Sequence, residues 1–318
     1  MGELKNTFSW SFSAAKDFET CPRKRYWSKY RMWNGWNADA DPECRAAYRL
    51  NKMSSRHTLK GVAVEDSIMW VLRRRQMGQE VTMNDAYEQI ARPLLNGAWQ
   101  DSRQQRWKQN AKKFTCLHEH YYPQFLPDSQ QDWPKRIALE VKQCITNFID
   151  QVLPRLMDIR ADQEVPVCTV QMGDPESFEF DGIKVYAIPD YVYRDGDLLH
   201  IHDWKAGRPM DSHASQLAVY GLWAGIRHGV RPENIETHLE YLMTGQTASA
   251  RLREEDVAEI SQHIRSTAAD MAEYLENADR EANVPVGREE WDMAAERSVC
   301  SRCNFYELCA PELAELGL

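Results

Sequence analysis

Two aspartates and a lysine are spaced in the sequence so that they can form one small polar site. Asp190 follows a proline, and Asp203 and Lys205 are two residues apart near the end of a second apolar run. The two runs, residues 186–193 and 198–205, are rich in β-branched and aromatic residues, so we expect a β-hairpin with a four-residue turn. Because side chains alternate along a strand, Asp203 and Lys205 project to one side, and pairing across the hairpin brings Asp190 beside them.

This pattern favours metal-dependent hydrolysis of phosphodiesters. Adjacent carboxylates repel each other unless a cation lies between them, and a hard ion such as Mg²⁺ or Mn²⁺ prefers oxygen ligands. Such an ion activates water and neutralises charge on the phosphate, while an ammonium helps to position and deprotonate the water. The alternative is a solvated group of surface ion pairs, because short Asp/Lys patterns on hairpins are common.

A third acidic residue, Glu65, falls within a helical pattern that we expect to span residues 61–75. Val62, Ile68 and Leu72 share its face by the three-and-four spacing of a helix. A carboxylate on an apolar stripe is costly when buried unless it is paired or binds an ion, so Glu65 is a candidate third metal ligand. The alternative is a solvated residue at the edge of the stripe.

Cysteines near the two ends of the chain indicate a second metal centre. Cys300, Cys303 and Cys309 are spaced C-x2-C-x5-C, one thiol short of a tetrahedral set. Cys21 precedes Pro22 and so lies at a helix start, where a thiolate is favoured. If Cys21 completes the set, four thiolates suit either Zn²⁺ or an iron–sulfur cluster, and the spacing does not decide between them. We expect the other cysteines to be small buried hydrophobes: Cys44, Cys116, Cys144 and Cys168.

Basic residues follow Cys21 directly. Arg23, Lys24 and Arg25 begin a predicted helix at residues 23–31 in which charges are interleaved with aromatic residues. This composition suits a track for a nucleic-acid backbone. The alternative is an amphipathic helix that buries its aromatic residues and solvates its charges.

The remaining pattern predicts a mixed α/β core with a large helical insertion. Strands are expected at residues 165–170, 177–180, 183–186 and 236–243. Helices are expected after the lysine strand, where one includes residues 213–223, and at residues 254–276. Gln216 and Tyr220, four residues apart in the first of these helices, share a face. The expected segments are an N-terminal segment, a helical region, the core and a cysteine-bearing C-terminal segment: residues 1–53, 54–160, 161–285 and 286–318.

Composition limits the class of protein. The formal net charge of −9 disfavours a general nucleic-acid coat but permits a local basic track beside an acidic metal site. No apolar run reaches the length of a membrane span, and the first residues lack the apolar region of a signal peptide. We therefore expect a soluble, cytoplasmic protein with reduced thiols and no membrane partner.

Taken in order, these motifs resemble the RecB-like branch of the PD-(D/E)XK nucleases. The resemblance is closest to members with an iron–sulfur cluster, namely the CRISPR-adaptation-associated RecB-like exonucleases and the nuclease domains of AddB type. The motifs that carry it are Cys21-Pro22-Arg23, Gly61-Val62-Ala63-Val64-Glu65, Pro189-Asp190, Asp203-Trp204-Lys205, Gln216-x3-Tyr220 and the terminal cysteine triplet. The family usually has histidine where this sequence has Glu65, and commonly glycine where it has Ala187.

The resemblance implies a restriction-endonuclease-like mixed sheet flanked by helices, with a cysteine-clamped 4Fe-4S cluster. It implies that Glu65, Asp190 and Asp203 hold Mg²⁺ or Mn²⁺, that Lys205 assists hydrolysis, and that the Gln/Tyr helix lies beside the site. The four cluster ligands would be Cys21, Cys300, Cys303 and Cys309.

The expected function is that of a metal-dependent DNA nuclease, an exonuclease acting on single-stranded or end-containing DNA in repair, CRISPR adaptation or phage defence. The alternatives are a zinc-stapled nuclease and a catalytically weak RecB-like subunit that binds DNA or acts as a scaffold in a larger complex. The expected partners are DNA and the proteins of such a complex. The sequence predicts no oligomeric state.

Overall fold

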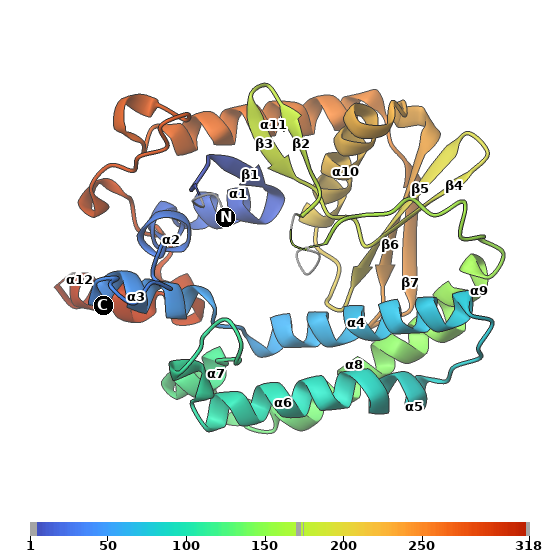
Figure 1. The fold of residues 1–318 in the computed structure, drawn as a ribbon, viewed down its shortest axis with the longest axis horizontal. Coiled ribbons are helices and arrows are strands. Elements are labelled where there is room, and N and C mark those ends of the chain that lie inside the picture. Colours follow the sequence, from blue (N-terminus) through green and yellow to red (C-terminus); the bar gives the residue numbers. More distant parts are fainter. Residues whose placement is uncertain (1–4, 170–172, 174, 316–318) are drawn as a thin grey trace.

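Alternating apolar residues form two β-sheets, shown in Figure 1 beside the helices that cover them. The computed structural model describes residues 5–169, 173 and 175–315. The smaller sheet has the strand order β1-β3-β2, with β1 at Ser9–Ser11, β2 at Ser177–Phe180 and β3 at Ile183–Tyr186. β1 pairs in parallel with β3, so the N-terminal segment is part of the core.

The larger sheet carries the residues expected to do chemistry. Its order is β4-β5-β6-β7, and its strands span Tyr191–Asp195, Leu198–Lys205, Ile235–Tyr241 and Gln246–Arg251. β5 and β6 are parallel, and helix α10 (Ser212–His228) connects them and packs on one face of the sheet. The expected mixed α/β core is confirmed.

The hairpin of β4 and β5 has a tighter turn than expected. Asp195 pairs with Leu198, so only Gly196 and Asp197 form the turn, and the predicted four-residue turn is wrong. Gly196 has a φ of +59°, a left-handed conformation that glycine adopts readily and that two-residue hairpin turns require.

The first run of the predicted hairpin is also interrupted. β3 ends at Tyr186 and β4 begins at Tyr191, so Asp190 lies directly before a strand rather than within one. Pro189 lies in this break, and proline has no backbone N–H to donate to a neighbouring strand.

The expected helical insertion covers the other face of the larger sheet. Its longest helix, α4 (Arg56–Gln76), packs against α8 (Trp133–Asn147). Helix α4 is capped by Ser55, whose side chain accepts a hydrogen bond from the Thr58 N–H. The same apolar cluster includes Trp204 of β5, so β5 is covered on both faces. The other helices of the insertion are α5 (Met83–Ala86), α6 (Arg92–Arg103), α7 (His118–Tyr121), the π-helix η6 (Phe148–Val152) and α9 (Leu153–Leu156). Helix α3 (Pro42–Asn51) precedes the insertion and packs with the two ends of the chain.

The two ends of the chain meet in a third apolar cluster built on Trp27 and Phe305, and α2, α3 and α12 lie together there in Figure 1. The Trp27 indole N–H donates to the Cys309 sulfur at 3.3 Å. The helices of the two ends are α1 (Phe12–Thr20), α2 (Pro22–Arg25), the π-helix η1 (Tyr26–Arg31), α11 (Glu254–Ala272) and α12 (Tyr306–Glu315).

Some expected elements differ. Residues 165–169 form no strand, and the remaining residue of that predicted strand, Val170, lies outside the described residues. Cys168 is exposed rather than buried, whereas Cys44, Cys116 and Cys144 are buried as expected. In the part of the chain that the structure describes, no helix is both long and apolar enough to cross a membrane.

Candidate active site

Asp203 and Lys205 lie on the face of β5 that meets α10. The Asp203 side chain is 3% exposed, and its Oδ2 atom lies 2.5 Å from the Lys205 Nζ atom. This contact lacks hydrogen-bond geometry, so the buried Oδ2 atom has no hydrogen-bond donor. The period-two alternation of a strand explains why both side chains share this face.

Asp190 is held beside this pair by the backbone of β5. Its Oδ2 atom accepts a hydrogen bond of 2.6 Å from the Trp204 N–H. Burial, followed by the charge of Asp203, raises the pKa of Asp190 well above its usual value, and the Trp204 N–H only partly offsets this. The two carboxylates are therefore close enough to repel each other, and a proton or a cation is needed between them.

Helix α10 supplies a chain of hydrogen bonds that orients the lysine. Lys205 Nζ donates to Gln216 Oε1 at 2.7 Å, and Gln216 Nε2 donates to the Tyr220 hydroxyl at 2.8 Å. The Tyr220 hydroxyl lies 3.2 Å from the Ile188 carbonyl and 3.3 Å from Asp203 Oδ1, both of which are acceptors. Gln216 and Tyr220 thus link the lysine to the aspartate.

Glu65 lies near the site, but on a different face of α4 from the one expected. Ile68 and Leu72 of α4 are buried, but Val62 is 37% exposed and Glu65 is also exposed, so the prediction that Glu65 lies on an apolar stripe is wrong. The packed face of α4 is instead shifted round the helix towards Ala63. Nearby protein still raises the pKa of Glu65, first by removing water and then through the charges of Asp66 and Asp203.

These acids fit a hard divalent cation. Asp190, Asp203 and Glu65 offer only oxygen ligands, and Asp203 presents a buried oxygen that pairs with the Lys205 ammonium but accepts no well-aligned hydrogen bond. Among the described residues, the three carboxylates do not all lie within 4.8 Å of one another, so at least one side chain must move for all three to bind one ion. The donor chemistry suits Mg²⁺ or Mn²⁺.

Further polar residues line a cavity of about 550 Å³ beside Lys205 that the sequence did not reveal as part of the site. His213 lies one helical turn before Gln216, a spacing that could have drawn attention to it. Lys16 comes from α1, and its Nζ donates to the Ser212 hydroxyl at 3.0 Å. No local signal links Lys16 to residues almost two hundred positions away.

The sequence matches the PD-(D/E)XK nuclease superfamily over residues 9–310. The chain belongs to this superfamily. Membership implies a metal-dependent nuclease, and the mixed α/β architecture agrees with the superfamily fold. A search among curated proteins found no match.

Outside the acidic site of this superfamily member, four thiols line one cavity of about 220 Å³: Cys21, Cys300, Cys303 and Cys309. Burial, and then the nearby thiols, raise the pKa of Cys303 to about 12, although the Phe305 N–H and Lys24 lower it. No three of these described sulfur atoms lie within 4.8 Å of one another. The thiolates around a single tetrahedral Zn²⁺ are about 3.8 Å apart, so these four sulfur atoms are spread more widely than in a zinc site.

The basic residues next to Cys21 do not form the expected DNA-facing surface. Arg23 and Arg25 are each only 4% exposed. The Arg23 guanidinium pairs with Glu312 at 2.9 Å, and Arg25 donates to the Ser9 carbonyl at 3.1 Å. The prediction that these two arginines contact DNA is therefore wrong. Lys24 is half-buried and pairs with Asp17 at 2.7 Å.

Proposed function

We propose that the protein is a Mg²⁺- or Mn²⁺-dependent deoxyribonuclease that degrades single-stranded or end-containing DNA from an end. The observation that carries the proposal is the convergence of Asp190, Asp203 and Lys205 on one face of β5, in a chain that belongs to a nuclease superfamily. Two carboxylates with a cation requirement and one oriented ammonium are the groups that phosphodiester hydrolysis uses.

Each residue has a distinct proposed role. Asp190, Asp203 and Glu65 would hold the metal. When bound, the ion supplies Lewis-acid activation of water and neutralises charge on the phosphate. Lys205, aimed by Gln216, positions the attacking water and stabilises negative charge on the phosphate oxygens. The Tyr220 hydroxyl contacts both the Asp203 carboxylate and the Gln216 amide and so fixes their relative orientation.

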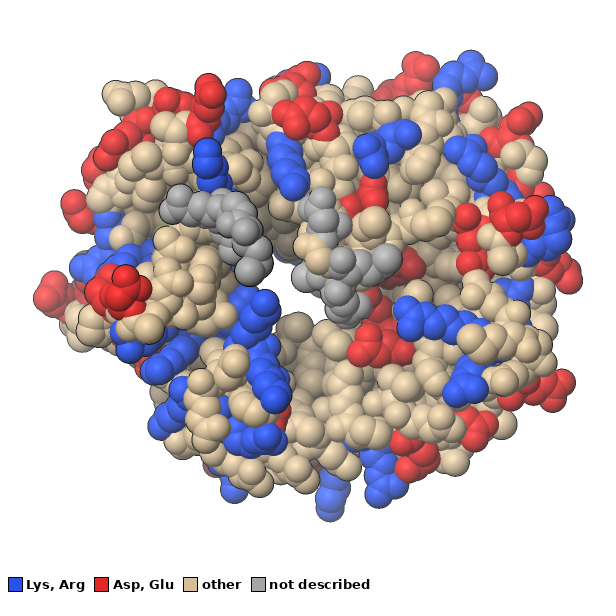
Figure 2. Space-filling view, in the orientation of Figure 1, with Lys and Arg blue, Asp and Glu red and all other residues tan. Residues whose placement is uncertain are grey.

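The shape of the molecule supports action at an end. Figure 2 shows an opening through the centre of the protein, with acidic side chains along its right edge and basic side chains along its left edge. In Figure 1 the same region lies between α2, α4 and α10. An end of a strand can pass into such an opening, and basic groups opposite a metal site can hold its phosphates.

We also propose that the four cysteines hold a 4Fe-4S cluster. The wide spacing of their sulfur atoms supports a cluster, whose thiolates surround several irons, over a single Zn²⁺. The cavity lies between the two ends of the chain, so the cluster would serve as a structural clamp. The RecB-like resemblance supports a role in DNA repair, CRISPR adaptation or defence, together with protein partners.

Linear and circular substrates test the proposed activity. Wild-type protein with Mg²⁺ or Mn²⁺ should degrade end-labelled linear single strands and leave circular single strands of the same sequence intact. Cleavage of circles would refute the requirement for an end. DNA binding without cleavage of either substrate in any divalent metal would favour the alternative role as a DNA-binding scaffold.

A further inference from the structure

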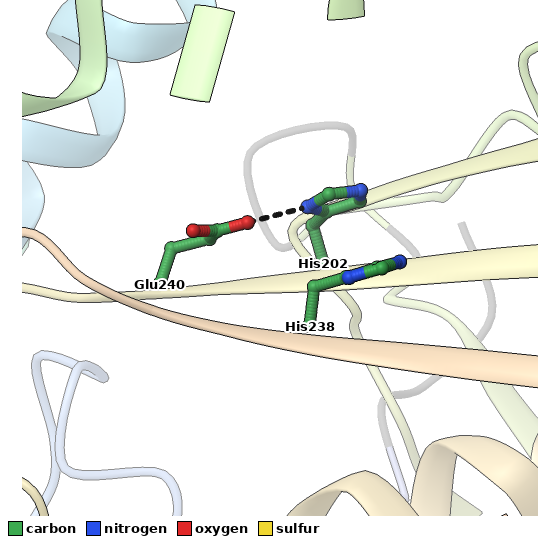
Figure 3. Close-up of side chains that lie close together, drawn as sticks. All are labelled: His202, His238 and Glu240. Atoms are coloured by element: carbon green, nitrogen blue, oxygen red, sulfur yellow. Dashed lines mark hydrogen bonds and ion pairs between the residues drawn. The ribbon is translucent and has the colours of Figure 1, made fainter. Parts of the chain in front are cut away.

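A compact cluster of histidines with one glutamate lies on the opposite face of the larger sheet from Asp203, and Figure 3 shows His202, His238 and Glu240. His202 of β5 pairs directly with His238 of β6, and Glu240 lies two residues further along β6 on the same face. Ligand atoms of these three side chains all lie within 4.8 Å of one another. All three residues are at most 7% exposed.

We propose that His202, His238 and Glu240 form a second metal site that binds Zn²⁺ or a similar late first-row divalent ion. Two imidazoles and one carboxylate are a ligand set that Zn²⁺ favours, in contrast to the all-oxygen set at Asp190 and Asp203. The proposal does not depend on nuclease activity.

Unpaired nitrogen atoms point to a missing partner in this cluster. His202 Nδ1 lies 3.1 Å from Glu240 Oε1, which leaves its buried Nε2 atom without any hydrogen-bond partner. A third imidazole, His200, lies 3.0 Å from His238 Nε2 through its Nδ1 atom, and its own Nε2 atom is also buried and unpartnered. The three imidazoles thus have more ring nitrogen atoms than the surrounding donors and acceptors satisfy.

The surrounding side chains already orient the ligands as an outer shell would. Arg155 and Thr247 donate to Glu240 Oε2 at 2.7 and 2.6 Å, whereas Oε1 contacts His202, so an ion would bind between Oε1 and that imidazole. Ser249 holds His238 Nδ1 at 2.8 Å. Second partners of this kind fix the orientation of metal ligands in proteins.

Such an ion would fasten β5 to β6 directly behind the catalytic residues. Asp203 and Lys205 project from the other face of the same strand, and the histidine face is covered by Trp204, which packs edge-on against Phe148 at 5.4 Å. Because all three ligands are buried, a substrate cannot reach this ion, so its role would be structural although three protein ligands leave a fourth position open.

Zinc content tests the proposal. Chelator-treated protein is dialysed against Zn²⁺, and bound metal is measured by mass spectrometry for wild type, His238→Gln and Glu240→Gln, with the exposed His228→Gln as the matched control. Wild type and His228→Gln should bind one more Zn²⁺ per chain than either cluster variant, whose affinity at this site should fall at least about tenfold. Equal zinc content in all four proteins would overturn the proposal.

Cobalt gives a second measurement that needs no variant to fold. Wild-type protein loaded with Co²⁺ should show the visible bands of a site with nitrogen and oxygen ligands, in addition to any thiolate-to-cobalt bands from the cysteines. A spectrum that contains thiolate bands alone would overturn the proposal even if both cluster variants fail to fold.

Discussion

Replacing Lys205 with alanine should separate metal binding from cleavage. The Lys205 Nζ atom lies 2.5 Å from Asp203 Oδ2, so any cation at that oxygen competes with the ammonium. Even with the dielectric constant of bulk water, a charge pair at this distance is worth about 1.7 kcal/mol. Removing the ammonium should therefore tighten metal binding by about tenfold or more.

Cleavage should move in the opposite direction. An oriented ammonium that assists proton transfer or stabilises charge contributes about 10²- to 10⁴-fold to the rate. Lys205→Ala should lose that factor, although it binds metal more tightly than wild type. An alanine at the exposed Lys135 removes the same charge from a distant surface and should leave both quantities unchanged.

Single-turnover cleavage of an end-labelled single strand and calorimetric titration with Mn²⁺ measure the two quantities separately. If Lys205→Ala cleaves within about tenfold of wild type, the ammonium has no part in the reaction. If the variant instead loses metal affinity, Lys205 acts by holding the carboxylates in place, and the proposed role in the reaction is refuted.

Four other outcomes are expected. The pKa of Asp190 is higher in the folded than in the unfolded protein, so protonation of Asp190 stabilises the metal-free fold below its unfolded-state pKa of about 3.9, and this stabilisation is lost as pH rises through the folded-state pKa. Thermal melts of Asp190→Asn at a series of pH values should lack this pH-dependent stabilisation. Glu65→Ala should weaken Mn²⁺ binding in a titration, whereas Glu65→His should retain it and shift preference from Mg²⁺ towards Mn²⁺; unchanged affinity in Glu65→Ala would make this residue a solvated bystander. Cys303→Ser should lower iron and sulfide content and bleach anaerobically purified protein, while the exposed Cys168→Ser keeps its colour; a colourless wild type with one zinc per chain would exclude the cluster. Arg23→Ala should lower the free energy of unfolding by about 2 kcal/mol in a denaturant titration, because Glu312 loses its nearest partner and keeps only a 3.5 Å contact with Arg288. A stable variant with weaker DNA binding would contradict the assignment of Arg23 to the interior.

The parts of the site that follow from local geometry could be predicted from the sequence. The two-residue spacing of Asp203 and Lys205 fixes their common face, and the four-residue spacing of Gln216 and Tyr220 does the same on a helix. These rules hold because the backbone period sets the direction of each side chain. The mixed α/β fold was predictable from the same strand and helix periods, whereas the superfamily was identified from the resemblance of the motifs and their order along the chain.

Features that depend on tertiary packing were not predictable. The face of α4 that is buried depends on where α8 and the sheet lie, so three-and-four spacing alone assigned Glu65 to the wrong surface. Arg23 and Arg25 resemble a nucleic-acid track in sequence, but their partners, Glu312 and the Ser9 carbonyl, are set by the meeting of the two chain ends.

The histidine cluster depends partly on local geometry and partly on tertiary packing. Alternation along β5 places His200 and His202 on one face, which local reasoning can find. Their partners on β6 depend on the register of two parallel strands separated by α10, and a one-residue shift would move His238 and Glu240 to the other face.

The parallel pairing of β1 with β3 has a consequence for synthesis of the protein. Ser9 pairs with Lys184, and the Trp10 indole donates a hydrogen bond of 2.8 Å to Thr267, which is 257 residues further along the chain. Contacts between such distant residues form slowly, because a long loop must close before they can stabilise the fold. A ribosome-bound chain that has not reached Thr267 would therefore expose Trp10, which is fully buried in the folded protein, to solvent and to chaperones.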